Sequence, residues 1–265
     1  MDQEQPIPPD PAPAAPLDAV AGLDHAVYGG PEKPVLVLLH AGGMTRHEWD
    51  PFLAAWAPRF RLVVPTAPGH GASPADGALT VDSMADATLR LLDALGVERA
   101  HFLGSSMGGA TSLRVALRRP DRVDRLILYR SGFRTGTSAL AALRRMATPE
   151  TWRHWGLEQW MQREHAPRGG PDEWRAVIRQ VAAAFERPDA SLDPADLARV
   201  AAPTLLIAGD RDNHVPLEDL VVMYRSIPEA SLWIVPRAGH LMAMETWRRA
   251  AFLEEVRRFL EVKRQ

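Results

Sequence analysis

A five-residue segment at 104–108, Gly-Ser-Ser-Met-Gly, joins two runs of different character. The apolar run before it (100–103) has the composition of a buried strand, and the run after it (110–117) is amphipathic with helical spacing. A chain that passes so abruptly from strand to helix needs glycine on either side of the turn, because a side chain there would collide with the adjoining backbone. The glycines of the segment and Gly109 meet that need. The hydroxyl of Ser106 would then stand clear of the sheet, which makes it a candidate nucleophile.

Short apolar runs recur along the chain and are expected to be strands. Most are apolar on both faces, as the strands of a buried parallel sheet are. The expected strands are 26–28, 35–39, 62–64, 101–103, 126–128, 205–207 and 232–235. Helical patterns alternate with them, and the clearest follows Thr80, a suitable N-cap, and stops at Gly96. This alternation predicts an α/β fold with a doubly wound, mostly parallel sheet.

The alternation breaks in one internal stretch and is absent from the start of the chain. Residues 133–200 show short helical patterns separated by proline and glycine, so we expect a helical cap there, inserted into an α/β core of residues 21–132 and 201–265. Residues 1–20 are rich in proline and nearly devoid of large apolar side chains. Such a segment cannot bury enough surface to order itself, so we expect a flexible arm.

A serine nucleophile needs a histidine to accept its proton and a carboxylate to orient that histidine. In this architecture they follow the serine in the order acid, histidine. Asp210 and Asp212 come directly after the sixth expected strand, and His240 comes after the seventh. Because parallel strands end at one edge of the sheet, we expect Ser106, one of these carboxylates and His240 to meet there.

Several motifs that follow the expected strands resemble those of the α/β-hydrolase superfamily, over the chain from about Leu23 to Leu260. The motifs are Leu-Leu-His-Ala-Gly-Gly at 38–43, Pro-Gly-His-Gly-Ala-Ser at 68–73, the serine turn at 104–111, Pro-Asp-Arg-Val at 120–123 and Gly-His at 239–240. Within the superfamily the chain resembles meta-cleavage-product C–C hydrolases, esterases and enol-lactonases. The resemblance implies an α/β-hydrolase fold with a cap and a serine mechanism.

The resemblance also implies a role for each candidate catalytic residue. Ser106 would be the nucleophile and His240 the base. In the family pattern the acid lies three residues past the glycine that closes its strand, which points to Asp212 and leaves Asp210 as a turn residue.

Acyl transfer also needs two N–H donors for the oxyanion, an oxygen that becomes negatively charged in the tetrahedral intermediate. Met107, directly after the nucleophile, would supply one donor. The resemblance assigns the second to Gly42, with Ala41 as the alternative. His40 and His70 lie in the neighbouring motifs, and we expect them to serve as hydrogen-bonding residues.

Four of the eight tryptophans, at positions 152, 155, 160 and 174, fall within the expected cap. Their indoles would either hold the cap to its base or line an apolar pocket over the serine. The candidate pocket residues are Ala41, Met44, Trp152, Trp155, Trp160 and Leu241. Four basic residues either face solvent or contact a substrate carboxylate: Arg46, His47, Arg130 and Arg134.

Two positions depart from the C–C hydrolase pattern. Ser105 stands where those enzymes usually have asparagine, and Leu241-Met242 stands where they usually have tryptophan. Both departures favour an ester hydrolase acting on a small, apolar or aromatic ester or lactone. The alternatives are a C–C bond hydrolase or lactonase on the same triad and, from another class, a ligand-binding protein on a hydrolase scaffold.

Composition limits the other classes of partner. The formal net charge of −2 gives no electrostatic reason to expect nucleic acid, and no run approaches the roughly 18 apolar residues that cross a bilayer. The chain has no cysteine, so disulfides and thiolate metal sites are excluded. We expect a cytoplasmic protein that needs no metal ion or organic cofactor and does not act on a membrane. The sequence leaves the oligomeric state open.

Overall fold

The computed structural model describes residues 22–75, 77–240 and 248–262. The expected arm at 1–20 and the pocket candidate Leu241 therefore lie outside the described residues. Within the described ranges, no helix combines the length and the apolar character that crossing a membrane demands.

The described strands form one sheet in the order β1-β3-β2-β4-β5-β6-β7. β1 is antiparallel to β3, and every other neighbouring pair is parallel. The strands are β1 His25–Tyr28, β2 Val35–Leu39, β3 Arg61–Pro65, β4 Ala100–Ser105, β5 Val123–Tyr129, β6 Thr204–Gly209 and β7 Ala230–Val235. Each expected strand falls within one of these, so the prediction of a mostly parallel α/β sheet is confirmed.

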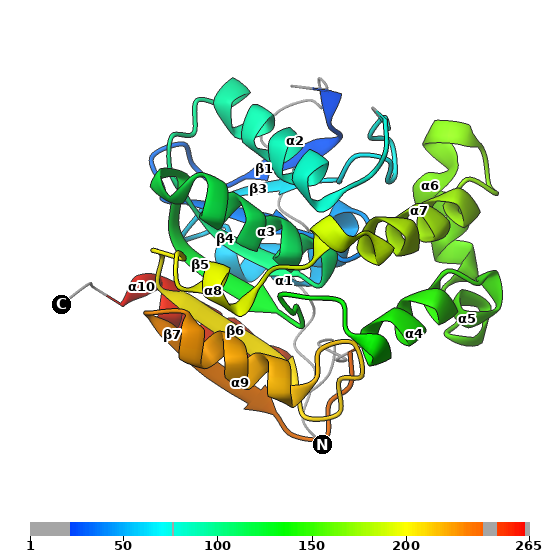
Figure 1. The fold of residues 1–265 in the computed structure, drawn as a ribbon. Coiled ribbons are helices and arrows are strands. Elements are labelled where there is room, and N and C mark those ends of the chain that lie inside the picture. Colours follow the sequence, from blue (N-terminus) through cyan, green and yellow to red (C-terminus); the bar gives the residue numbers. More distant parts are fainter. Residues whose placement is uncertain (1–21, 76, 241–247, 263–265) are drawn as a thin grey trace, which may run out of the picture.

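Helices cover both faces of the sheet, as Figure 1 shows. The core helices are α1 Asp50–Trp56, α2 Val81–Ala94, α3 Met107–Arg118, α9 Leu217–Ser226 and α10 Arg248–Glu261. One apolar cluster joins α2, α3 and α9 to the strands, and a second joins α1 and α10 to the opposite face. Successive strand residues contribute to opposite clusters, because side chains alternate between the two faces of a strand. The sheet is thereby buried on both sides, as its apolar runs predicted.

α2 begins where its sequence signals a start. The Thr80 hydroxyl accepts a hydrogen bond from the Ser83 amide at 2.9 Å, and the Ser83 hydroxyl accepts one from the Thr80 amide at 2.9 Å. This capping box satisfies two N–H groups that have no partner within the helix. After the helix, Gly96 adopts a positive φ of 67°, which suits a glycine stop.

Four helices between β5 and β6 gather beyond one end of the strands (Figure 1). They are α4 Thr137–Met146, α5 Pro149–His154, α6 Glu158–Gly169 and α7 Trp174–Glu186, and a last short helix, α8 Pro194–Leu197, packs beside α9. Trp152, Met161, Trp174 and Ile178 form a small apolar core among the four. Val181 of α7 packs against the cluster that contains Met107, which ties these helices to the serine turn.

The break between α6 and α7 lies at a glycine rather than at the proline before it. Pro167 lies inside the last turn of α6, which continues to Gly169. The helix ends at Gly170, whose φ of 91° is rarely adopted by a residue with a side chain.

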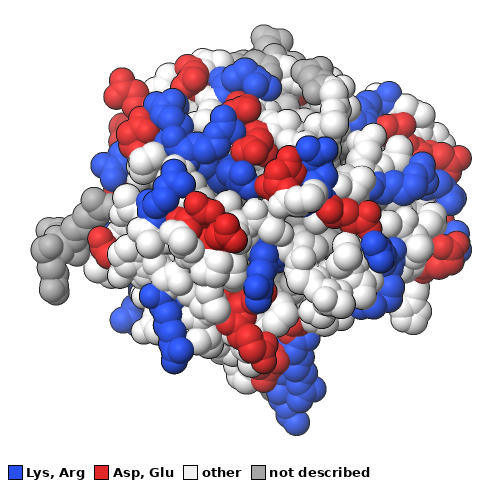
Figure 2. Space-filling model, in the orientation of Figure 1, with Lys and Arg blue, Asp and Glu red and all other residues white. Residues whose placement is uncertain are grey.

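Charged side chains of both signs are interspersed on the face that carries α2, α3 and α9, as Figure 2 shows. Ion pairs account for much of this mixture, for example the contacts of Arg118 with Asp82 at 3.2 Å and with Asp86 at 2.7 Å. On this face neither sign forms a continuous field.

Candidate active site

Ser106 occupies the turn between β4 and α3 in a strained backbone conformation. Its φ is 50° and its ψ is −110°, a combination that residues with a side chain seldom adopt. A Cβ at Gly104 would overlap the carbonyl of Gly108, and a Cβ at Gly108 would overlap the carbonyl of Leu39. These close approaches explain why the turn is built from glycine and why the serine projects from it.

The three candidate catalytic side chains are in hydrogen-bonding contact. The Ser106 hydroxyl lies 3.0 Å from His240 Nε2, and His240 Nδ1 lies 2.9 Å from Asp212 Oδ2. The carboxylate can only accept, so Nδ1 carries the proton and Nε2 is free to accept the serine proton. Asp212 also accepts from the amides of His214 at 2.8 Å and Val215 at 3.1 Å.

Burial and hydrogen bonding set the protonation of this pair. Burial opposes the charge of Asp212, but the hydrogen bond from His240 and the backbone amides hold the pKa of its carboxyl below the usual value. Burial lowers the pKa of His240, although Asp212 partly opposes that shift. A histidine with a lowered pKa is neutral near pH 7, which is the state that a general base requires.

The second carboxylate in this loop, Asp210, accepts a hydrogen bond from the backbone rather than from His240. It accepts from the amide of Ala238 at 3.2 Å and so joins the loop after β6 to the loop that carries His240. Of the two candidate acids, only Asp212 hydrogen-bonds to the imidazole.

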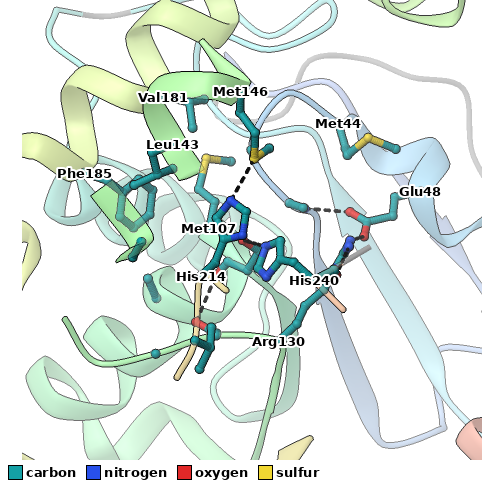
Figure 3. A pocket seen from close by; sticks show the side chains of 18 of the residues that line it. Met44, Glu48, Met107, Arg130, Leu143, Met146, Val181, Phe185, His214 and His240 are labelled. Atoms are coloured by element: carbon teal, nitrogen blue, oxygen red, sulfur yellow. Dashed lines mark hydrogen bonds and ion pairs between the residues drawn. The ribbon is translucent and has the colours of Figure 1, made fainter. Parts of the chain in front are cut away.

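His214 lies beside the imidazole rather than in solvent. Its ring stacks on that of His240 with centroids 4.0 Å apart and planes 25° from parallel (Figure 3). Burial, together with the neighbouring His240, lowers the pKa of His214 to about 3. His214 is therefore a neutral ring that packs against one face of the candidate base.

A buried ion pair lies beneath these residues and was not expected from the sequence. Glu48, in the short helical segment Arg46–Trp49 after β2, pairs with Arg130 Nη2 at 2.6 Å, and the two side chains are only 7% and 9% exposed. Burial opposes the charge of Arg130, but Glu48 together with Tyr129 and Asp212 outweighs this and raises its pKa. Ser105 lies between them: its hydroxyl donates to Glu48 and accepts from Arg130 Nε, both at 2.9 Å.

The same pair reaches the two loops on either side of the serine turn. Glu48 Oε2 accepts from the Ala41 amide at 2.6 Å, and Arg130 Nη1 donates to the carbonyl of His240 at 2.9 Å. The Ala41 N–H is thus occupied by a carboxylate. Gly42, the next residue, lines the cavity in front of Ser106 together with Met107.

Comparison with known proteins decides the family. A family model described as the alpha/beta hydrolase family matches residues 36–254. The chain belongs to the alpha/beta hydrolase family. The resemblance inferred from the serine turn and the neighbouring motifs is therefore confirmed.

Three similar proteins illustrate the range of this family. A hydrolase of known structure from Pseudomonas aeruginosa PA01 is 33% identical, with a TM-score of 0.72 over 91% of this chain and 94% of its own. The 2-hydroxy-6-oxo-6-phenylhexa-2,4-dienoate hydrolase of Burkholderia cepacia is 28% identical over 239 residues, 77% of this chain and 80% of that protein. The pimeloyl-(acyl-carrier protein) methyl ester esterase of Pectobacterium carotovorum is 43% identical over 96 residues, 36% of each chain.

In this α/β-hydrolase, a histidine from the cap holds the loop after β2. His165 of α6 is fully buried, and its Nε2 lies 2.9 Å from the carbonyl of Gly43. Its Nδ1 lies 2.9 Å from the amide of Gly71. The carbonyl can only accept and the amide can only donate, so Nε2 carries the proton, Nδ1 accepts, and the ring is neutral. Neither His165 nor its role was expected from the sequence.

Two further buried histidines complete this support, as expected for hydrogen-bonding residues. His40 Nδ1 lies 2.8 Å from the carbonyl of Ala41, and His40 Nε2 accepts from the amide of Ala67 at 2.8 Å. His70 Nε2 accepts from the amide of Gly43 at 3.2 Å. Burial lowers the pKa of both histidines, so both are neutral near pH 7.

His165 gives the hydrolase a predictable sensitivity to acid. Burial lowers the pKa of His165 from 6.5 to about 4. Between these pH values the unfolded chain binds the proton and the folded protein does not, so the free energy of unfolding falls as the pH is lowered. From the two pKa values we expect His165 to contribute about 3 kcal/mol of this loss between pH 6.5 and 4.

The measurement is urea unfolding of wild type and His165→Gln across this pH range. Glutamine can still donate to Gly43 but cannot titrate, so the variant should lose less stability in acid. His154→Gln, at an exposed histidine that ends α5, is the control and should retain the wild-type pH dependence. Equal acid sensitivity in all three proteins would show that His165 does not carry the effect.

A cavity of about 600 Å³ opens in front of Ser106 between the core and the cap. The cavity wall includes five of the six pocket candidates: Ala41, Met44, Trp152, Trp155 and Trp160. Trp174 instead lies in the small core of the cap. In Figure 3, Leu143 of α4 and Phe185 of α7 lie on one side of His214, and Met44 and Glu48 lie on the other.

Proposed function

We propose that the protein is a serine hydrolase that cleaves a carboxylic ester. The observation that carries the proposal is the chain of contacts from the Ser106 hydroxyl to His240 Nε2, at 3.0 Å, and from His240 Nδ1 to Asp212, at 2.9 Å. His240 takes the serine proton as Ser106 attacks the ester carbonyl, and Asp212 holds the imidazole tautomer and offsets its transient charge.

The tetrahedral intermediate needs preorganised N–H donors. The proposed donors are the amides of Met107, the first residue of α3, and Gly42. Ala41 is the weaker candidate because its amide already donates to Glu48 at 2.6 Å. His240 then protonates the leaving alcohol, and a water molecule repeats the cycle on the acyl-enzyme.

Two observations support an ester over a C–C bond. Ser105 stands where C–C hydrolases usually have asparagine, and its hydroxyl is fully engaged between Glu48 and Arg130. One of the similar proteins is named as a methyl ester esterase. The second candidate function, C–C bond or lactone hydrolysis on the same triad, is favoured by the similarity to the dienoate hydrolase.

A substrate panel separates these functions. We expect the purified protein to hydrolyse p-nitrophenyl esters with a kcat/KM well above that for a lactone or a vinylogous dienoate, and a fluorophosphonate to label Ser106, located by peptide mass spectrometry. Comparable turnover of the dienoate would replace the ester assignment with C–C hydrolysis. The absence of both an adduct and turnover would favour a ligand-binding protein.

A further inference from the structure

The charges that line the cavity limit which substrates it can hold. Among the described residues of the cavity wall, the basic side chains are His47, Arg130, Arg134, His214 and His240. Of the segments that the structure does not describe, 1–21 and 241–247 contain neither lysine nor arginine, whereas 263–265 contains Lys263 and Arg264. Within the described part of the wall, the state of these five side chains decides whether a substrate carboxylate meets a cation.

Arg130 is already neutralised. Glu48 pairs with one end of the guanidinium at 2.6 Å, and the Ser105 hydroxyl and the His240 carbonyl accept from its other nitrogens at 2.9 Å. Both members of the pair are buried, so a substrate carboxylate that drew Arg130 away would leave Glu48 buried without a counter-ion. Such an exchange is strongly unfavourable.

Arg134 is held by a second buried carboxylate. Its Nη2 lies 2.6 Å and its Nε 3.1 Å from Asp219 Oδ1, and the guanidinium lies over the ring of Phe133 at 5.2 Å. The Asp219 side chain is only 7% exposed. The Arg134 side chain is itself 50% exposed, but its charge is matched by that of Asp219, so the pair presents no net positive charge to a substrate carboxylate.

The three histidines do not supply a free cation either. His214 is neutral near pH 7 because burial and His240 lower its pKa to about 3, and His240 must be neutral to act as the base. His47 lies 2.8 Å from Asp50 and 3.9 Å from Glu164. The hydrogen bond to Asp50 raises the pKa of His47, but two carboxylates against one imidazolium leave no net positive charge there.

We propose that this cavity is selective for uncharged substrates, so that the ester it cleaves carries no carboxylate or other anionic group on the portion bound inside. The inference rests on the proposed ester hydrolysis and adds the chemical class of the substrate. An anionic group would lose its hydration in the cavity without gaining a counter-ion. An apolar or aromatic chain would instead contact Leu143, Phe185 and the three cap tryptophans that line the cavity.

The test compares two esters that differ in one charge. Mono-p-nitrophenyl suberate ends in a carboxylate, and its methyl-capped diester has a similar length without the charge. Release of p-nitrophenolate at pH 8 gives kcat/KM for both, and we expect the value for the acid to be about 100-fold lower. Comparable values, or a preference for the acid, would overturn the inference while leaving ester hydrolysis intact.

Binding is measured separately, so that the two proposals can fail independently. Calorimetric titration of the Ser106→Ala variant with suberate monomethyl ester and with dimethyl suberate gives the Kd of a charged and an uncharged ligand in the absence of turnover. Tighter binding of the diester supports the inference, and equal binding contradicts it. Failure of wild type to hydrolyse either aryl ester would count against the proposed function alone.

A variant that releases Arg134 tests the cause of the selectivity. In Asp219→Asn the guanidinium loses its counter-charge, so we expect kcat/KM for the suberate acid to rise about tenfold while that for the methyl-capped ester is unchanged. Glu186→Gln is the matched control, because its partner Arg144 is 66% exposed and does not line the cavity. No gain in Asp219→Asn, or an equal gain in both variants, would contradict the role given to the Arg134 pair.

Discussion

Replacing Ser106 with alanine is expected to lower kcat for ester hydrolysis by about 10⁴-fold or more, because the variant has no hydroxyl to form the acyl-enzyme. KM should change little, since the cavity wall and the positive-φ turn are kept. Initial rates with a p-nitrophenyl ester measure the effect, and mass spectrometry should show no fluorophosphonate adduct. Thermal unfolding should confirm that the variant is folded.

Ser138→Ala is the matched control for that experiment. Ser138 is an exposed serine in the first turn of α4, and its removal should leave both the rate and the labelling unchanged. Full activity in Ser106→Ala would place the nucleophile elsewhere and remove the basis for the proposed mechanism.

Replacing Glu48 with glutamine is expected to have the largest effect on stability. The change leaves Arg130 buried without its counter-ion and weakens the acceptor of the Ala41 and Ser105 hydrogen bonds. Breaking a buried ion pair in this way typically costs about 3–5 kcal/mol. Because Arg130 also holds the carbonyl of His240, kcat should fall as well.

Guanidinium unfolding measures the stability, with two companion variants. Glu48→Gln/Arg130→Met removes both charges and should recover a large part of the lost stability, because no unpaired ion is left. Asp121→Asn breaks an exposed pair with Arg119 and should leave the unfolding midpoint unchanged. If Glu48→Gln unfolds at the same denaturant concentration as Asp121→Asn, the buried pair does not contribute the expected amount of about 3–5 kcal/mol to the free energy of unfolding.

Those parts of the site that depend on local sequence could be predicted. Glycine on either side of Ser106 indicates that neighbouring backbone leaves no room for a Cβ. The structure shows these close backbone approaches at Gly104 and Gly108. Asp212 and His240 follow apolar runs that become parallel strands, and parallel strands deliver their following loops to one edge. The meeting of these three side chains could therefore be predicted from the sequence alone.

The supporting contacts could not be predicted, because each joins residues far apart in the chain. Glu48 and Arg130 are 82 positions apart, and His165 is 122 positions from Gly43. No spacing rule marks such pairs, since their encounter depends on how the cap and the loops pack. A charged residue that directly follows a strand, such as Arg130, cannot be told from a solvated one in the sequence until its partner is placed.

The hydrogen bond from His165 to Gly43 bears on how new specificities could be engineered. A chimera that grafts a foreign insert between β5 and β6 would change the cavity wall, but it would also deprive the core of a donor for the peptide next to Gly42. Transplants that carry an imidazole at the equivalent place in the third inserted helix should retain turnover, whereas those that lack it should bind their new ligands yet react slowly.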